Sequence, residues 1–236
     1  MTGGKRVAIV QSNYVPWRGY FDLVASVDEF ILLDDAQYTR RDWRNRNRIK
    51  TSQGTRWLTI AVQVSGRYTQ SIYDTHVAEG DWAERHWDVL RQQYARAGGF
   101  AEMGDFVAEL YATAPGPSLS QVNRHFLTRI ADRLGIETKI TCSSEYKPQG
   151  AKTERLVDLC VKASASEYVS GPAARAYLEE ESFHNHDIAV SWFEYGPYGD
   201  YDQVHPPFDP QVSVLDLLLC AGHEAAALVR PLARRS

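Results

Sequence analysis

Residues 6–35 read RVAIVQSNYVPWRGYFDLVASVDEFILLDD and hold two short apolar runs, at residues 6–10 and 29–33. Because neither run alternates apolar with polar residues, each predicts a strand that is buried on both faces. Residues 20–26 between them predict a short amphipathic helix. The order strand, loop, helix, strand is typical of a parallel βαβ unit, whose ligands gather at the carboxyl ends of the strands.

The remainder of the chain extends this unit. Further strands are predicted at residues 57–62, 135–140, 167–169 and 188–193, and further helices at 81–97, 106–111, 119–134, 153–162, 172–181 and 213–220. We therefore predict one α/β domain over residues 1–236, with a mostly parallel, Rossmann-like sheet and a mainly helical inserted segment at about residues 80–134.

Composition narrows the class of function. A chain of 236 residues with 44% hydrophobic content is long enough for a full core and for an enzyme. The formal net charge is -4, which argues against a general nucleic-acid-binding protein. Near the N-terminus only Val7 to Val10 form an apolar run, too short for a signal peptide or a membrane span, so we expect a cytoplasmic protein with no membrane partner.

The cysteines and histidines predict no metal and no other cofactor. Cys142, Cys160 and Cys220 are odd in number and share no C-x-x-C spacing, which indicates neither a disulfide framework nor a zinc knuckle. We expect Cys160 and Cys220 to be buried thiols in apolar helices. His184 and His186 have the spacing of a metal pair on a strand, but the sequence offers no third ligand.

Residues 34–48 read DDAQYTRRDWRNRNR and carry five arginines around Trp43. Guanidinium groups bind phosphate or carboxylate with two parallel hydrogen bonds, and a neighbouring indole can stack on a guanidinium or a base. We therefore expect a local site for an anionic ligand, either a small phosphorylated metabolite or a phosphopantetheine arm. The alternative is a solvated charged face or a hairpin.

Asp34, Asp35 and His205 are the candidates for proton transfer. The two carboxylates follow the second predicted strand, and at most one of them is expected to face a given site because successive strand residues point to opposite faces. The alternative is a turn carboxylate that binds backbone amides. His205 lies in a loop at residues 195–210 that is rich in Pro, Gly, Tyr and Asp, and we expect this loop to form a movable rim.

Lys152 and Ser170 precede two further predicted helices. A lysine and free amides at a helix N-terminus can hold phosphate, and a capped surface helix is the alternative for residues 152–155. Ser170 follows a strand and is expected to face the same crevice as Gln11 and Asp34. The loop after the first predicted strand has the position at which nucleotidyl-transferring folds of the HIGH type carry their phosphate-binding histidines. This chain has no histidine there. An ATP-dependent ligase or nucleotidyl transferase therefore stays an alternative that rests on fold analogy.

Six blocks together resemble the WbqC-like protein family. They are QSNYVPWRGYFDL at 11–23, LDDAQY at 33–38, WRNR at 43–46, KTERL at 152–156, YVSGPA at 168–173 and LDLL at 215–218. The chain departs from the family pattern at Ser12, where proline is usual, and at Cys220-Ala221-Gly222, where asparagine, cysteine and glycine often stand. Members are typically found with bacterial surface-polysaccharide or specialised-metabolite biosynthesis.

That resemblance implies a biosynthetic transferase that forms an amide or ester by acyl or aminoacyl transfer to an amino-sugar nucleotide or a carrier-bound intermediate. A phosphopantetheine carrier protein is then a possible partner. A non-catalytic protein that binds a phosphorylated ligand or a carrier protein is the other alternative. The expected catalytic residues are Asp35, Asp34 and His205, and the expected substrate-binding residues are Gln11, Tyr14, Trp17, Gln37, Tyr38, Arg40, Arg41, Trp43, Arg44, Arg46, Lys152, Ser170 and Gln203.

Overall fold

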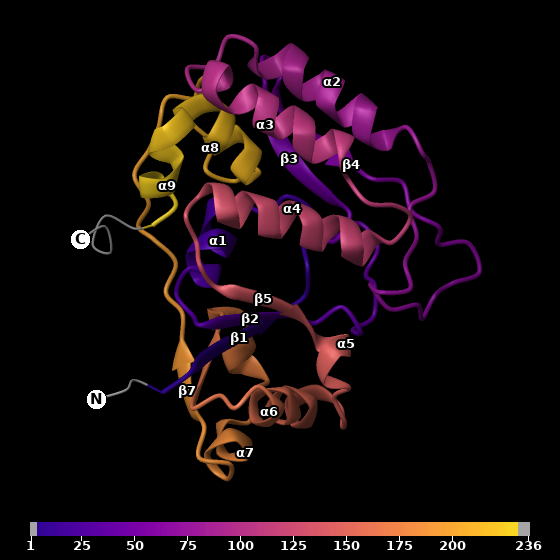
Figure 1. Cartoon of the computed structure of the whole chain (residues 1–236), viewed down its shortest axis with the longest axis vertical. Coiled ribbons are helices and arrows are strands. Elements are labelled where there is room, and N and C mark those ends of the chain that lie inside the picture. The colour runs from indigo at the N-terminus through magenta and orange to yellow at the C-terminus, as the bar shows by residue number, and fades with distance from the viewer. Residues whose placement is uncertain (1–3, 231–236) are drawn as a thin grey trace.

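The computed structural model describes residues 4–230, which form a parallel sheet with its helices and, beyond one edge of that sheet, a helical region with a hairpin (Figure 1). The sheet has five strands in the order β5-β2-β1-β6-β7, and all neighbouring pairs are parallel. The strands are β1 (Arg6–Val10), β2 (Glu29–Leu32), β5 (Lys139–Cys142), β6 (Glu167–Ser170) and β7 (Ala189–Trp192). The predicted α/β class with a parallel sheet is confirmed.

The strand order reverses beside β1. The chain runs from β1 outward to β2 and β5, and then returns to pair β6 with the other side of β1. In open α/β sheets, ligands bind outside the carboxyl ends of the strands at such a reversal. The loop after β1 therefore occupies the position where this class of fold places its ligand.

Helices cover both faces of the sheet, and the alternation of side chains along the strands explains how. Val7 and Ile9 belong to the core cluster under α6 and α7, whereas Ala8 and Phe30 belong to the cluster under α1 and α4. Apolar residues at every strand position thus serve two cores. The covering helices are α1 (Arg18–Val24), α4 (Leu119–Arg133), α5 (Ser143–Tyr146), α6 (Lys152–Lys162) and α7 (Glu180–His184).

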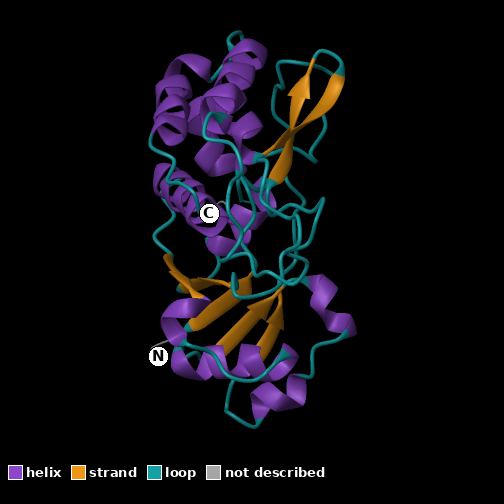
Figure 2. Ribbon diagram, turned by 90° about the vertical axis from the view of Figure 1, so that its right-hand side faces the viewer, coloured by secondary structure: helices purple, strands orange, loops and turns teal. Residues whose placement is uncertain are grey.

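The long connection from β2 to β5 builds the second region. It contains the antiparallel hairpin of β3 (Arg46–Thr51) and β4 (Gly54–Thr59), followed by α2 (Trp82–Tyr94), α3 (Phe100–Ala112) and α4. The helix α8 (Val214–Ala221) returns from the end of the chain and packs against α3, and the short α9 (Ala225–Leu228) follows. Figure 2 shows the hairpin projecting away from the sheet.

Several local predictions differ from the structure. The strand predicted at residues 135–140 is β5 at Lys139–Cys142. The arginine-rich segment supplies β3, for which a hairpin was only the alternative because Ile49 is its only aliphatic residue. Residues 172–181 form a 3₁₀ turn at Pro172–Ala176 and only the start of α7, instead of one helix. His184 ends α7, so His184 and His186 are not alternate residues of a strand. Within residues 4–230, no helix combines the length and the apolar character needed to cross a membrane.

Candidate functional site

The carboxyl edge of the sheet gathers polar residues that are far apart in the sequence. Because β1, β2 and β6 are parallel neighbours, Gln11, Asp34 and Ser170 lie at the same edge. The side-chain amide of Gln11 is half-buried and has no hydrogen-bond partner among residues 4–230. Ser170 is buried, with 4% of its surface exposed.

Asp34 fixes the loop between β1 and α1, residues 11–17, which we call the first loop. Its side chain is buried, and its carboxylate accepts hydrogen bonds from the backbone N–H of Ser12 at 2.9 Å and from the hydroxyl of Ser120 at 2.5 Å. Burial raises the pKa of Asp34, and the two hydrogen bonds act in the opposite direction. Asp34 therefore joins the end of β2 to the loop after β1 and to α4.

Asp35 has a different environment. Its carboxylate accepts a hydrogen bond from the hydroxyl of Ser143 at 2.6 Å and forms an ion pair with Arg155 of α6. The side chain retains 26% exposure. The two neighbouring carboxylates thus contact different elements, and Asp35 is the one that remains open to solvent.

Arg44 also fixes the first loop through hydrogen bonds. Its guanidinium donates to the backbone carbonyls of Gln11 at 3.3 Å and Ser12 at 3.2 Å, and to the Oδ1 atom of Asn13. Asn123 of α4 adds a hydrogen bond from Nδ2 to the Ser12 hydroxyl at 3.0 Å. Arg44 is therefore occupied by the protein itself, although the sequence predicted it as a ligand for phosphate.

Arg46 and Arg48 lie on one face of the hairpin together with the indoles of Trp43 and Trp57. The Arg46 guanidinium carbon is 4.1 Å from the centre of the Trp57 ring, and that of Arg48 is 5.7 Å from the centre of the Trp43 ring. The two indole centres are 5.2 Å apart. No carboxylate among residues 4–230 lies within 4.0 Å of Arg46 or Arg48. Both charges are thus available to an anion, and indole faces orient them.

The side chains of the other two arginines of the segment have different surroundings, although the backbone carbonyl of Arg41 accepts a hydrogen bond from the Arg46 guanidinium. Arg40 donates to the backbone carbonyl of Val64 at 2.8 Å and lies 5.5 Å from the centre of the Tyr68 ring. Arg41 is exposed, with a positive φ of 59°. The structure therefore divides the predicted arginine cluster among three environments.

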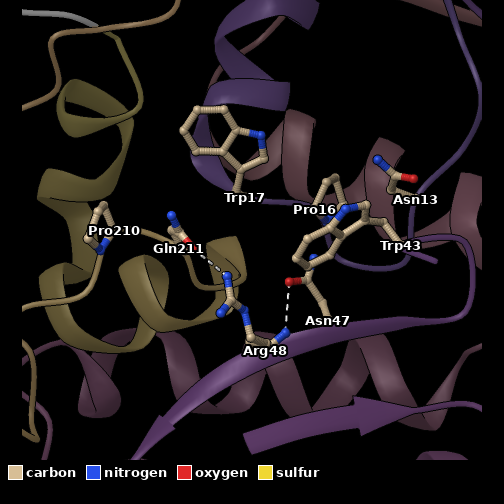
Figure 3. Close-up of a pocket in the computed structure, with 8 residues that line it drawn as sticks. All are labelled: Asn13, Pro16, Trp17, Trp43, Asn47, Arg48, Pro210 and Gln211. Carbon is tan, nitrogen blue, oxygen red and sulfur yellow. Dashed lines mark hydrogen bonds between the residues drawn. The ribbon is translucent and has the colours of Figure 1, made fainter. Parts of the chain in front are cut away.

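A cavity of about 550 Å³ lies between the first loop, the hairpin and the segment before α8 (Figure 3). Its lining consists of Asn13, Pro16, Trp17, Trp43, Asn47, Arg48, Pro210 and Gln211. Trp17 and Trp43 belong to the predicted substrate-binding set. Trp17 is held from behind by Tyr195 and Tyr198, whose ring centres lie 5.4 and 5.8 Å from its own.

The remaining lining residues were not predicted to be in the site. Asn47 and Arg48 lie inside the arginine-rich segment, and a strand period of two would have placed Arg48 on the same face as Arg46. Gln211 gives no signal in the sequence, because only the fold brings the segment before α8 next to β3.

Tyr14 lies in the core. It is fully buried, and its hydroxyl lies 2.8 Å from the Nδ1 atom of His86 and 2.6 Å from the hydroxyl of Tyr111. Burial lowers the pKa of His86 to about 4, so this imidazole is neutral at physiological pH. Tyr14 therefore connects the first loop to α2 and α3 and has no surface left for a ligand.

Three other predicted residues lie outside the cavity lining. Gln37 donates to the backbone carbonyl of Tyr68 at 2.9 Å, and Tyr38 is 7% exposed. Lys152 is exposed at the first residue of α6. None of these three contributes to the cavity between the hairpin and the first loop.

The loop that carries Gln203 and His205 is fastened through Asp216. This carboxylate of α8 is fully buried and accepts hydrogen bonds from Tyr94 at 2.6 Å, Tyr201 at 2.6 Å and Gln203 at 2.9 Å. Burial raises the pKa of Asp216, and these donors oppose the shift. The Nε2 atom of His205 lies 3.2 Å from the backbone carbonyl of Gln93. The loop thus bridges α2 and α8.

We expect Cys160 and Cys220 to resist alkylation in the folded protein. Both thiols are buried, and burial raises the pKa of each to about 12, which leaves almost no thiolate at neutral pH. Mass spectrometry after iodoacetamide treatment should show both unmodified in buffer and fully modified in urea, which serves as the control. Rapid modification of either thiol in buffer would contradict this expectation.

The fold defines a Rossmann-like α/β protein, with a cavity beyond the carboxyl end of the first strand. The WbqC-like protein family matches residues 11–228, and the chain belongs to that family. The chain is 53% identical to "Uncharacterized protein Rv1507c" of Mycobacterium tuberculosis (strain ATCC 25618 / H37Rv) over 226 residues, which cover 96% of this chain and 98% of the relative. No solved structure matches the chain.

Proposed function

We propose that the protein is a biosynthetic transferase that binds a phosphorylated intermediate in the cavity beside β3 and forms an amide or ester on it. The acceptor is an amino-sugar nucleotide or a carrier-bound intermediate, and the transferred group is acyl or aminoacyl. The resemblance described above supplies the reaction, and the cavity supplies the ligand class.

The observation that carries the proposal is the position of Arg48 in the cavity. Its guanidinium has no carboxylate partner among residues 4–230, and its one side-chain hydrogen bond goes to the neutral Gln211 at 2.7 Å. Charged donors without a counter-charge favour an anion, and guanidinium geometry matches phosphate. Trp17 and Trp43 add flat apolar surface for the organic part of the same ligand.

Asp35 is the proposed proton acceptor. It lies at the carboxyl edge of the sheet and keeps an exposed carboxylate, whereas Asp34 is enclosed by its own hydrogen bonds. The ion pair with Arg155 orients the Asp35 carboxylate. His205 is the alternative acceptor from the loop before α8. Replacing each in turn by asparagine, as D35N and H205N, separates the two by the loss of turnover.

Arg48→Ala is expected to weaken the binding of UDP-N-acetylglucosamine and of pantetheine 4′-phosphate by about 10- to 100-fold. The loss corresponds to one charge-assisted hydrogen bond, worth about 1.5–3 kcal/mol. Isothermal titration calorimetry measures it. Arg56→Ala is the matched control, because Arg56 pairs with Ile49 and projects from the opposite face of the same hairpin. Equal losses of affinity in Arg48→Ala and Arg56→Ala would mean that the ligand responds to the overall charge of the hairpin. The assignment of the site to the cavity would then be wrong.

A non-catalytic binding protein is the second candidate, and one observation favours it. The eight residues that line the cavity include no carboxylate and no imidazole, so the general acid or base has to come from outside the lining. Mass spectrometry of an amino-sugar nucleotide incubated with protein and an acyl-coenzyme A or aminoacyl donor decides between the candidates. Tight binding without any mass increase would favour the binding protein.

A further inference from the structure

The orientation of two amides in the cavity follows from the chemistry of their neighbours. A guanidinium only donates hydrogen bonds, so each amide must turn its oxygen toward its arginine. The Oδ1 atom of Asn13 accepts from Arg44, and the Oε1 atom of Gln211 accepts from Arg48 at 2.7 Å. The NH₂ groups of both amides are therefore left facing elsewhere, and neither has a partner among residues 4–230.

The cavity as a whole presents donors. Besides these two NH₂ groups, the indole N–H groups of Trp17 and Trp43 have no partner in the part of the chain that the structure describes. Both groups of the Asn47 side-chain amide already have partners. Its NH₂ group donates to the carbonyls of Tyr14 and Val15, and its oxygen accepts from the backbone N–H of Arg48. A ligand that fills this cavity must therefore supply acceptors.

The two free amides lie on opposite sides of the cavity. Asn13 comes from the loop after β1 and Gln211 from the segment before α8, and Figure 3 shows them on opposite sides of the lining with Arg48 below. In the same view the amide nitrogen of Asn13 is turned toward Trp17. A ring with a carbonyl on each side matches this pair of donors, while the indoles offer faces on which such a ring stacks.

We propose that the ligand of this cavity is a nucleoside diphosphate sugar whose base is uracil or thymine. The carbonyls of the base accept from Asn13 and Gln211, its ring packs on the indoles, and the diphosphate contacts Arg48. The inference rests on the proposed function, because it selects the nucleotide from the two acceptor classes named there. A pantetheine arm fits less well, since it has no aromatic ring to pack on the indoles.

Other bases meet this cavity with the wrong groups. Cytosine and adenine carry an amino group, which places a donor against the donors of the cavity. Guanine has two acceptors, O6 and N7, but both lie on one edge of the ring, whereas Asn13 and Gln211 approach from opposite sides. The carbonyls of uracil and thymine flank the ring nitrogen between them and so face both ways.

Calorimetric titration of the full chain with UDP, dTDP, CDP, ADP and GDP tests the assignment. UDP and dTDP are expected to bind at least about tenfold tighter than the other three, because the other bases leave a buried donor or acceptor without a partner. Equal affinities, or a preference for CDP, would overturn the assignment. The assignment would also be overturned if none of the five nucleotides bound.

Asn13→Asp and Gln211→Glu sharpen the test, because each keeps the oxygen that its arginine binds and replaces the free donor by an acceptor. The variant of the amide that faces the carbonyl at C4 is expected to shift the affinity ratio of UDP to CDP toward CDP by about tenfold, because cytosine carries an amino group at that position. The variant of the other amide faces the carbonyl at C2, which both bases carry, and is expected to weaken UDP and CDP alike. Arg56→Ala is the control, since Arg56 projects from the opposite face of the hairpin and its loss should leave the five affinities and their ratios unchanged. An unchanged ratio in both amide variants, with melting temperatures near that of the native protein, would contradict the assignment.

The two proposals fail separately. A preference for UDP and dTDP without acyl or aminoacyl transfer would leave the base assignment intact and remove the transferase. Transfer to a pantetheine-bound acceptor, with no preference among the five nucleotides, would keep the transferase and remove the base assignment.

Discussion

Replacing Asp216 by alanine is expected to lower the free energy of unfolding by about 3–5 kcal/mol, the largest effect that we expect from a single polar substitution. The buried carboxylate accepts hydrogen bonds from Tyr94, Tyr201 and Gln203, and the variant leaves the two tyrosine hydroxyls without this acceptor, whereas Gln203 still donates to the carbonyl of Asp209. Urea denaturation followed by tryptophan fluorescence measures the change.

Asp202→Ala is the matched control for Asp216→Ala. Asp202 lies in the same loop and is exposed, so its removal should change the free energy of unfolding by less than about 0.5 kcal/mol. If Asp216→Ala also changed stability by less than 1 kcal/mol, the hydrogen bonds would not fasten the loop. The hydrogen bonds of Asp216 would then be better explained by a role of the loop that carries Gln203 and His205 in catalysis than by a role in stability.

Asp34→Ala is expected to cost about 3 kcal/mol of unfolding free energy. It removes two buried hydrogen bonds to a charged group, from the backbone of Ser12 and the hydroxyl of Ser120, and each such bond contributes about 1.5–3 kcal/mol. Because Ser12 belongs to the loop beside the cavity, affinity for phosphorylated probes should fall together with stability. Chemical denaturation and calorimetry on the same preparation follow both quantities.

The neighbouring carboxylate provides the comparison. Asp35→Asn breaks the ion pair with Arg155. The side chain of Asp35 is 26% exposed and that of Arg155 is 31% exposed, and such partly exposed pairs contribute about 1 kcal/mol or less. Asp35→Asn should therefore leave stability almost unchanged. Full stability of Asp34→Ala would show that the contacts to Ser12 and Ser120 contribute little and would return Asp34 to the candidates for proton transfer.

The parallel sheet could be predicted from the sequence alone. Strands such as β1 and β2 are continuous apolar runs, and this local signal suffices because both faces of each strand are covered. It also placed Gln11, Asp34 and Ser170 at one edge, since parallel strands end together. The hairpin was predicted only as an alternative, because β3 carries charged residues at alternate positions and lies partly outside the core.

The role of each polar residue in and around the cavity depends on the tertiary structure. Arg44 and Arg48 are the same residue type four positions apart, yet Arg44 binds the first loop and Arg48 faces the cavity. Asp34 is enclosed because Ser120, which lies 86 positions away, reaches it from α4. Gln211 enters the cavity because α8 returns to β3. Strands are specified by local apolar pattern, whereas the environment of a charge depends on partners that folding brings from distant parts of the chain.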